Sequence, residues 1–286
     1  MKTIWFCILL VLVASNSSRA QGGFRMATYN IRYAAAADEQ SGNGWELRKM
    51  PLATLISGHG FDIVGTQEGN AQQLGDLTAL LPGYQYVGHP YGGSDGQLHN
   101  CATFYKTDLF DVLDSGVFWF SETPDTPSIG WDADDRRICQ WVQFREKSTS
   151  NTFFVFNVHF YWRNHTAKEQ SGPLLVRKIK EIAGDQPAIC NGDFNSPPET
   201  SQIQAVAALL SDSRAITQTP PKGAEGTNLG GGVFQGEPNA RIDYIFVSPH
   251  FSVTDYEVLS DVYNGNHHPA DHLPVTARVG WEAGDR

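Results

Sequence analysis

The sequence predicts an α/β fold in which two β-sheets are packed together and covered by helices. Short runs with strand-like periodicity outnumber helical runs, and the helical runs fall between strands along the whole chain. Two sheets covered by helices fit this count better than one doubly wound sheet. The chain has 286 residues, of which 41% are hydrophobic, so it contains enough apolar material for a sizeable core.

The predicted strands are short apolar or alternating runs bounded by Gly, Pro and Asn. In chain order they are Phe24–Asn30, Asp62–Thr66, Gln85–Gly88, Asn100–Lys106, Val112–Trp119, Arg137–Phe144, Thr152–His159, Ala188–Asn191, Ile242–Val247 and Ala270–Val279.

Helical spacing of apolar residues predicts helices between these strands. They are Trp45–Ser57, Asn70–Leu81, Pro173–Ala183 and Thr200–Leu210. Pro51 lies inside the first, so that helix is expected to bend or to start late. The third has two alternative starts: capping-box spacing at Thr166, or Pro173 in the first turn.

Residues 1–20 have the pattern of a secretory signal peptide. Lys2 precedes an apolar run from Ile4 to Ala14, and small residues close the segment at Ala20. The apolar run has about eleven residues, whereas a membrane span needs roughly 20. We therefore expect cleavage before Gln21, a secreted or periplasmic location, and one domain over residues 21–286. No linker divides that domain, and a monomer without a membrane span is expected.

Charge argues against a general polyanion binder. Without Lys2 and Arg19 the chain has about twelve more acidic than basic residues, and it contains no extended basic stripe of the kind that polynucleotide backbones favour. Its charge therefore does not favour nucleic acid as a partner.

The cysteines of the mature chain are predicted to be structural. Cys101, Cys139 and Cys190 lie in apolar strand-like runs, and their spacing matches no zinc site. Buried free thiols are expected, although one disulfide is the alternative in an oxidising compartment.

The loop richest in Gly and Pro is Pro220–Asn239. Its run Gly230-Gly231-Gly232 lacks the Gly-Lys-Ser/Thr ending of a phosphate-binding loop. We expect it to form a flexible turn over the surface.

Polar side chains stand at the ends or edges of several predicted strands. They are Asn30, Glu68, His159, Asp193, Asn195, Asp243, Asp271 and His272. Each alone has an ordinary structural alternative, such as a turn residue, a helix cap, an ion pair or a buried histidine. Strand ends gathered on one rim converge on a common cleft, so together they predict a functional site.

Four kinds of chemistry could use such a set of residues. Its carboxylates and amides, with no cysteine, favour Mg²⁺ or Mn²⁺. A zinc site on His268 and His272 would need a regular helix, which Pro269 prevents. A serine nucleophile lacks its Gly-x-Ser-x-Gly turn, and a pair of glycosidase carboxylates would leave Asn195 and His272 without a role.

In order and spacing, these motifs resemble the endonuclease/exonuclease/phosphatase superfamily. The most specific are Gly192-Asp-Phe-Asn and Asp271-His, supported by Arg241-Ile-Asp-Tyr-Ile-Phe and Gln67-Glu. The resemblance extends from Met26 nearly to the end of the chain. It implies a four-layer α/β/β/α sandwich of two packed mixed sheets, which agrees with the strand count.

The resemblance also implies a role for each position. The cation, Mg²⁺ or Mn²⁺, would be held by Asn30, Glu68 and Asp271. The catalytic residues would be His159, Asp193, Asn195, Asp243 and His272. The phosphate would be bound by Arg137, with Arg136 as the alternative alignment, and by Asn195 and His159. Asp243 would orient His272 as the base.

These implications agree with the chemistry of phosphate esters. The anionic ester repels a nucleophile, so a site needs a cation, hydrogen-bond donors and a base for water. We expect a secreted, divalent-metal-dependent phosphoester hydrolase in which an activated water attacks phosphorus. A small or carbohydrate-linked phosphodiester is the favoured substrate. The alternatives, in order, are a DNase I-like nuclease, a phosphomonoesterase or phosphoinositide phosphatase, a sphingomyelinase-like lipase and a catalytically silent binding module.

Two departures from the family pattern bear on the substrate. An aromatic pair, Phe160-Tyr161, follows His159 where relatives often carry an acid, and Asn70 stands where nucleases usually carry a basic residue. The first bears on how the leaving group is handled, and the second weakens a DNA assignment. Aromatic residues in or beside predicted loops either line a pocket for a sugar or base or pack under those loops: Trp45, Trp131, Tyr161 and Trp162.

Overall fold

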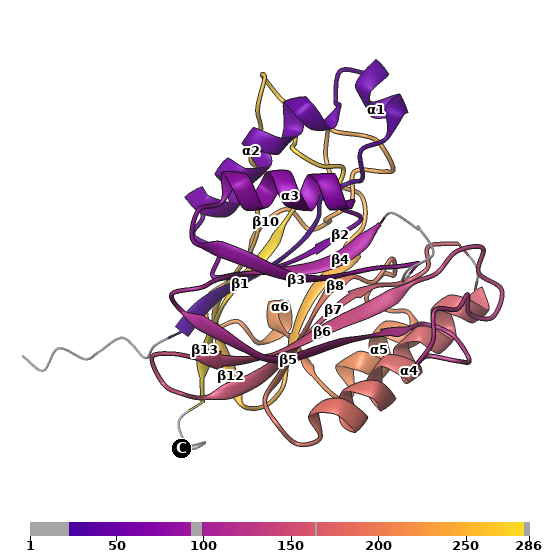
Figure 1. Ribbon diagram of the computed structural model, residues 1–286, viewed down its shortest axis with the longest axis vertical. Helices are drawn as coiled ribbons and strands as arrows, with labels where there is room; N and C mark the ends of the chain where they lie inside the picture. Colours follow the sequence, from indigo (N-terminus) through magenta and orange to yellow (C-terminus); the bar gives the residue numbers. More distant parts are fainter. Residues whose placement is uncertain (1–22, 93–98, 164, 283–286) are drawn as a thin grey trace, which may run out of the picture.

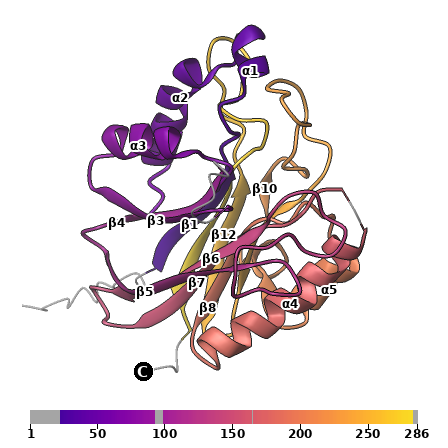
Figure 2. The same ribbon diagram turned by 45° about the vertical axis from the view of Figure 1, so that its right-hand side comes forward.

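Two β-sheets pack face to face, with helices on both outer faces (Figures 1 and 2). The computed structural model describes residues 23–92, 99–163 and 165–282, so the predicted signal peptide lies outside the described residues. Within these ranges the four-layer arrangement predicted from the sequence is confirmed. No helix in them is long and apolar enough to cross a membrane.

The first sheet has seven strands in the order β10-β12-β13-β1-β2-β4-β3. Their bounds are β1 Gly23–Asn30, β2 Ile63–Gln67, β3 Tyr84–Pro90, β4 Asn100–Lys106, β10 Lys222–Gly223, β12 Phe251–Val258 and β13 Val275–Trp281. Helices α2 (Trp45–Gly58) and α3 (Ala71–Leu80) lie on its outer face, and the short helix α1 (Ala36–Gln40) lies beyond α2 (Figure 1).

The second sheet has six strands in the order β5-β6-β7-β8-β11-β9. Their bounds are β5 Phe110–Trp119, β6 Ile138–Glu146, β7 Thr152–His159, β8 Ala188–Asp193, β9 Ser211–Asp212 and β11 Asp243–Val247. Helices α4 (His165–Ala183) and α5 (Ser201–Ala207) cover its outer face (Figure 2), and α6 is the short helix Ser213–Ile216 (Figure 1).

Apolar side chains fill the spaces between the layers. Between the sheets, Met26 and Ile63 of the first pack with Phe153 and Ile189 of the second. A second cluster joins α4 and α5 to the six-stranded sheet, and a third joins α2 and α3 to the seven-stranded sheet. Cys101, Cys139 and Cys190 are buried in these layers and unpaired, which confirms the predicted free thiols.

Below the ends of β1 and β2, polar side chains replace apolar ones between the two sheets. Gln67 Nε2 donates to Asn157 Oδ1 at 2.7 Å, and Asn157 Nδ2 donates to the carbonyl of Thr66 at 3.0 Å. A Cβ on Gly65 would lie 2.0 Å from Asn191 Nδ2, so any larger residue there would have to displace the buried Asn191 side chain. We call this group of Gly65, Thr66, Gln67, Asn157 and Asn191 the polar layer; it fixes the position of one sheet against the other.

The structure corrects two strand predictions. Strand β12 was not predicted, because its register shifts between Val253 and Asp255 and the shift interrupts the alternation of buried and exposed residues. The last strand begins at Val275 rather than Ala270. Pro274 has no N–H to donate to a neighbouring strand, so Asp271 and His272 lie in the preceding loop.

Two helix starts also differ from their sequence alternatives. Helix α2 begins at Trp45 with Pro51 inside it, so the late start is wrong. Helix α4 begins at His165, near the capping-box start, and the alternative start at Pro173 is wrong. Asp132 Oδ1 accepts from the backbone N–H of Ala167 at 2.9 Å. This distant carboxylate supports the first turn of α4, a contact that local sequence does not reveal.

Candidate active site

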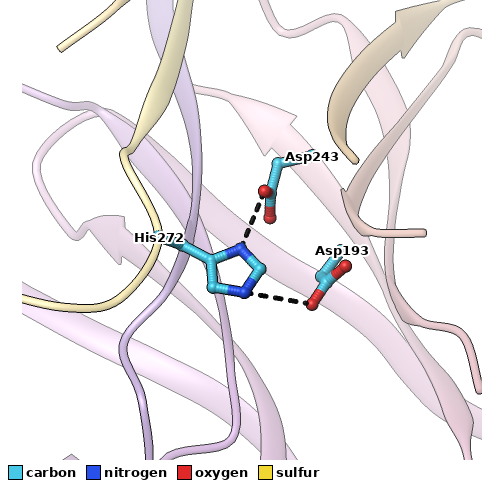
Figure 3. Close-up of side chains that lie close together, drawn as sticks. All are labelled: Asp193, Asp243 and His272. Atoms are coloured by element: carbon cyan, nitrogen blue, oxygen red, sulfur yellow. Dashed lines mark hydrogen bonds and ion pairs between the residues drawn. The ribbon is translucent and has the colours of Figure 1, made fainter. Parts of the chain in front are cut away.

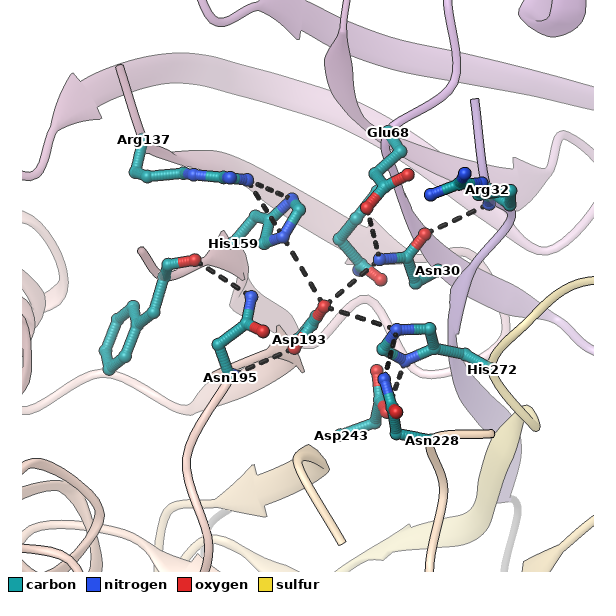
Figure 4. Close-up of polar contacts among 12 residues, drawn as sticks. Asn30, Arg32, Glu68, Arg137, His159, Asp193, Asn195, Asn228, Asp243 and His272 are labelled. Carbon is teal, nitrogen blue, oxygen red and sulfur yellow. Dashed lines mark hydrogen bonds and ion pairs between the residues drawn. The ribbon is translucent and has the colours of Figure 1, made fainter. Parts of the chain in front are cut away.

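The predicted site residues meet at one edge of the sandwich because two pairs of parallel strands end there. In the first sheet, Asn30 at the end of β1 lies beside Gln67 at the end of β2. In the second, His159 at the end of β7 lies beside Asp193 at the end of β8. Asp243 opens the antiparallel strand β11 directly opposite Asp193. Beside these ends lies a cleft of about 520 Å³, whose lining includes Glu68, His159, Asp193 and His272; Figure 4 shows these four side chains together.

Asp193 is buried at the centre of the group. Its Oδ2 accepts from Asn30 Nδ2 at 3.1 Å and lies 3.4 Å from His159 Nε2 and 3.8 Å from His272 Nε2 (Figure 4). Its Oδ1 accepts from the backbone N–H of Asn195 at 2.8 Å. Burial and the neighbouring charge of Asp243 raise the pKa of Asp193 to about 7.

His272 is held between two carboxylates. Its Nδ1 lies 2.8 Å from Asp243 Oδ2, as Figure 3 shows, and Thr227 Oγ1 donates to the same Asp243 oxygen at 2.6 Å. Asn228 Nδ2 lies 3.0 Å from His272 Nε2. Burial opposes protonation of the imidazole, but Asp243 and Asp193 outweigh it and raise the pKa of His272 well above its ordinary value. The predicted pairing of Asp243 with His272 is therefore present in the structure.

Glu68 and Asp271 form the acidic side of the cleft. Glu68 accepts from Asn30 Nδ2 at 3.1 Å and from the backbone N–H of Tyr33 at 3.2 Å. Burial opposes its ionisation, but the hydrogen bond from Asn30 and the charge of His272 hold the pKa of Glu68 below its usual value. Burial, together with the charge of Glu68, raises the pKa of Asp271.

These two carboxylates fit a hard divalent cation. Asp271 Oδ2 accepts from the backbone N–H of Gly232 at 2.7 Å, but Asp271 Oδ1 is buried without a hydrogen-bond partner in the described chain. Two neighbouring carboxylates with an unpartnered oxygen are the donors that Mg²⁺ and Mn²⁺ prefer. Asn30 differs from its predicted ligand role in one respect: it turns its N–H₂ toward Glu68 and Asp193, and its oxygen accepts from Arg32 N at 3.0 Å.

A second compact group is made by Asp193, Asp243 and His272, whose ligand atoms all lie within 4.8 Å of one another. Within this group, Asp243 Oδ2 and His272 Nδ1 already contact one another at 2.8 Å. The sequence predicts the cation on Glu68 and Asp271 instead, and it predicts catalytic roles for this second group.

Arg137 and His159 form the basic side of the cleft. Arg137 Nη1 lies 3.0 Å from Nε2 and 3.1 Å from Nδ1 of His159, and Arg137 Nη2 donates to Asp135 Oδ2 at 3.2 Å (Figure 4). Burial and the charge of Arg137 lower the pKa of His159 well below its ordinary value, which favours the neutral imidazole. Of the two aligned arginines, Arg137 is the one that contacts His159.

Backbone strain accompanies the site. Arg32, Glu68 and Asn195 have φ values of 55°, 70° and 48°, in the left-handed region that side chains other than glycine seldom adopt. The surrounding contacts must hold these conformations, and such strain is common where side chains are positioned for function.

A sequence profile described as the Endonuclease/Exonuclease/phosphatase family matches residues 27–272. The chain belongs to this family. The resemblance found in the sequence is therefore confirmed, and the protein is a phosphoester hydrolase of a family that uses divalent metals.

The relatives of this chain differ in how much of their own length is matched. The structure of a mannosyl-6-phosphatase from Bacteroides thetaiotaomicron is 37% identical and covers 90% of this chain and 100% of that one, with a TM-score of 0.85. Protein L388 of Acanthamoeba polyphaga mimivirus is 32% identical over 161 residues, 53% of this chain and 59% of the viral protein. The exoribonuclease subunit Ccr4 of Emericella nidulans is 23% identical over 223 residues, 57% of this chain and 33% of Ccr4. The matches thus span less than two thirds of the latter two proteins.

Sequence reasoning missed part of this family member's site. The predicted flexible surface turn at Pro220–Asn239 is wrong, because Thr227 and Phe234 are buried and the loop contacts Asp243, His272 and Asp271. Its partners are distant in sequence, so periodicity does not reveal them. The apolar residues Leu229 and Phe234 within a Gly-rich run were the available signal.

Sequence reasoning also missed Arg32 and Tyr91. Of the four aromatic residues expected in or beside loops, Trp162 faces the cleft. Arg32 lies 3.6 Å from Asp271, and the Tyr91 hydroxyl contacts His159. Trp162 lines the cleft and is 50% exposed. Trp45 and Tyr161 are buried and pack beneath the surface instead.

Proposed function

We propose that the protein is a divalent-cation-dependent phosphatase acting on small sugar phosphates. The observation that carries this proposal is the distribution of charge in the cleft. A small basic group, Arg137 with His159, lies among several carboxylates. Among the cleft's described lining residues the arginines are Arg32 and Arg137, and the carboxylates are Glu68, Asp135, Asp193 and Asp271. Such a cleft suits one phosphate group and disfavours a polyanionic strand.

The sugar assignment has separate support. The sequence favoured a phosphodiester, but the identity to a mannosyl-6-phosphatase covers that whole chain and favours a phosphate monoester of a sugar. Trp162 presents an exposed aromatic side chain at the cleft, a surface suited to packing against a sugar ring.

The residues divide the chemistry between them. Arg137 and His159 bind the nonbridging phosphate oxygens. His272 accepts the proton of the attacking water at Nε2, Asp193 orients that water, and Asp243 holds His272 in place through Nδ1. When bound to Glu68 and Asp271, Mg²⁺ or Mn²⁺ polarises the phosphoryl group and adds positive charge that favours the neutral imidazole.

Export is a further element of the proposal. Cleavage before Gln21 would deliver residues 21–286, as a monomer, to a secreted or periplasmic location. Amino-terminal sequencing of the protein recovered outside the cytoplasm tests the cleavage site, and light scattering tests the monomer.

A substrate panel tests the catalytic proposal. Purified protein with Mg²⁺ or Mn²⁺ is given mannose 6-phosphate, glucose 6-phosphate, a methyl-blocked sugar phosphodiester, an oligoribonucleotide and plasmid DNA. We expect the highest kcat/KM on a sugar monoester and none after EDTA. A higher value on the diester would restore the sequence-based preference, and a higher value on either nucleic acid would replace the proposal with a nuclease.

A further inference from the structure

Tyr91 contacts His159 on the basic side of the cleft, and none of the steps proposed above uses it. It is fully buried, directly after β3. Its hydroxyl oxygen lies 2.6 Å from His159 Nδ1, the shortest contact that this imidazole makes with a neighbouring side chain in the described chain.

Counting donors shows which way the proton of this contact points. The Tyr91 oxygen accepts from the backbone N–H of Glu68 at 3.3 Å, and the Cys101 thiol is a weaker donor at 3.8 Å. The backbone N–H can only donate, and at 3.8 Å the Cys101 sulfur is at most a weak acceptor. A phenol has one proton to donate, and within the described residues His159 Nδ1 is the acceptor that remains for it. Tyr91 therefore donates to Nδ1, which must be unprotonated.

Arg137 does not compete for that nitrogen. Its Nη1 is almost equally far from the two ring nitrogens, at 3.1 and 3.0 Å. An atom in the ring plane at those distances would collide with the carbon between the nitrogens, so Nη1 lies over the face of the ring. The lone pair of Nδ1 lies in the plane and is left to Tyr91.

The proton of the neutral imidazole is then on Nε2. Nε2 lies 3.4 Å from Asp193 Oδ2, and His159 lines the cleft where the phosphate is expected. We propose that Tyr91 is a positioning residue that fixes the Nε2–H tautomer of His159, so that His159 donates a hydrogen bond to the phosphoryl group and does not protonate the leaving group. The leaving oxygen takes its proton from water in the open cleft.

Nuclear magnetic resonance tests the tautomer without relying on activity. The chain has nine histidines, so His159→Gln identifies the His159 signals by difference in protein labelled with ¹⁵N-histidine. In the wild type we expect Nδ1 to resonate as an unprotonated nitrogen and Nε2 as a protonated one. Tyr91→Phe should give a mixture of tautomers. A protonated Nδ1 in the wild type overturns the proposal, whatever the variants do.

A matched variant separates this effect from a loss of stability. Tyr84 is another buried tyrosine, whose hydroxyl donates to the carbonyl of Phe61 on the far side of the first sheet. Tyr84→Phe should lower the unfolding temperature without changing the His159 spectrum. An equal change in that spectrum would show that Tyr91 acts only through general stability.

Kinetics test the second half of the proposal. His159→Gln keeps an N–H donor, whereas His159→Ala removes it and should lower kcat by about 100-fold. If His159 only donates a hydrogen bond, the loss in His159→Ala is the same for 4-nitrophenyl phosphate and for an alkyl phosphate. A much larger loss with the alkyl ester, whose leaving group needs a proton, would assign His159 as the general acid.

Discussion

The guanidinium of Arg48 donates to the carbonyl oxygen of Pro269 at 2.9 Å and so joins helix α2 to the loop that carries Asp271. It also donates to the carbonyl of Ile31 at 2.9 Å, one residue after Asn30, and to that of Asn43 at 2.8 Å. Arg48 is fully buried. One side chain thus connects the backbone on both sides of the predicted cation site.

Arg48→Met should destabilise the protein and weaken the cation site together. Several buried carbonyls lose their donor, so we expect a loss of about 3 kcal/mol or more in the free energy of unfolding, measured with urea. The Mg²⁺ concentration for half-maximal activity should rise. Lys106→Met is the control, because Lys106 pairs with Asp62 near the opposite end of β2. An unchanged Mg²⁺ requirement in Arg48→Met would contradict the link.

Glu68→Gln should weaken cation binding and activity in parallel. It removes one negative charge from the pair formed with Asp271, so calorimetry should show a higher Kd for Mn²⁺, and excess Mg²⁺ or Mn²⁺ should restore part of the activity. Glu146→Gln, a buried glutamate that contacts Trp281, serves as the control. Normal Mn²⁺ affinity in Glu68→Gln would exclude Glu68 as a ligand.

His272→Ala should lower turnover without weakening cation binding, in contrast to Glu68→Gln. Turnover should fall by roughly 100-fold or more while Mn²⁺ affinity stays nearly constant, and added metal should not restore activity. Asp243→Asn should lower turnover in the same way, because Asp243 Oδ2 holds His272 Nδ1 at 2.8 Å. The double variant should be little worse than the worse single variant, since the two residues act as one unit. Multiplicative losses would show independent roles.

Trp162→Ala tests the sugar side of the proposed function. The KM for a hexose phosphate should rise about tenfold, equivalent to about 1.4 kcal/mol, with little change in kcat. Inhibition by inorganic phosphate should not change, because Arg137 and His159 remain. Tyr86→Ala removes an exposed aromatic residue of β3 as the matched control. A rise in the phosphate inhibition constant would place Trp162 at the phosphate instead.

The three buried thiols should be unreactive in the folded protein. Burial raises the pKa of Cys101 to about 12 and also raises the pKa values of Cys139 and Cys190, so the reactive thiolate is scarce. We expect no reaction of the mature protein with Ellman's reagent until denaturant is added, and three equivalents afterwards. Fast labelling of the native protein would indicate local opening of a sheet.

The sequence predicted the strands and the site residues that follow them for a physical reason. The ends of parallel strands lie at the same edge of a sheet, so Asn30 and Glu68 come together in one sheet and His159 and Asp193 in the other, and packing of the two sheets joins the pairs. Loops have no such rule. The contacts of Asn228 and Gly232 depend on where a long loop crosses the cleft, and those positions follow from burial of Leu229 and Phe234.

Sequence patterns also could not predict side chains whose hydrogen-bond partners are far away in the sequence. Arg48 sits on a helix where a charged residue is normally exposed, yet it is buried because backbone carbonyls of three other segments surround it. Tyr91 follows an edge strand, and nothing in its neighbours indicates a contact with His159. Long-range hydrogen bonds of this kind become visible only once the two sheets are packed.

The polar layer has a consequence for how this protein can diversify. The two halves of the reaction centre lie on different sheets, and sliding one sheet by a single residue, about 3.3 Å, would break the 3.1 Å contact between Asn30 and Asp193. Because Gly65 and Asn157 fix that position from within the core, loops that hold none of the reacting groups, such as the one that carries Trp162, are free to lengthen or exchange residues without disturbing the chemistry. New substrates can then be acquired by changing the cleft walls alone, on an unaltered chemical core.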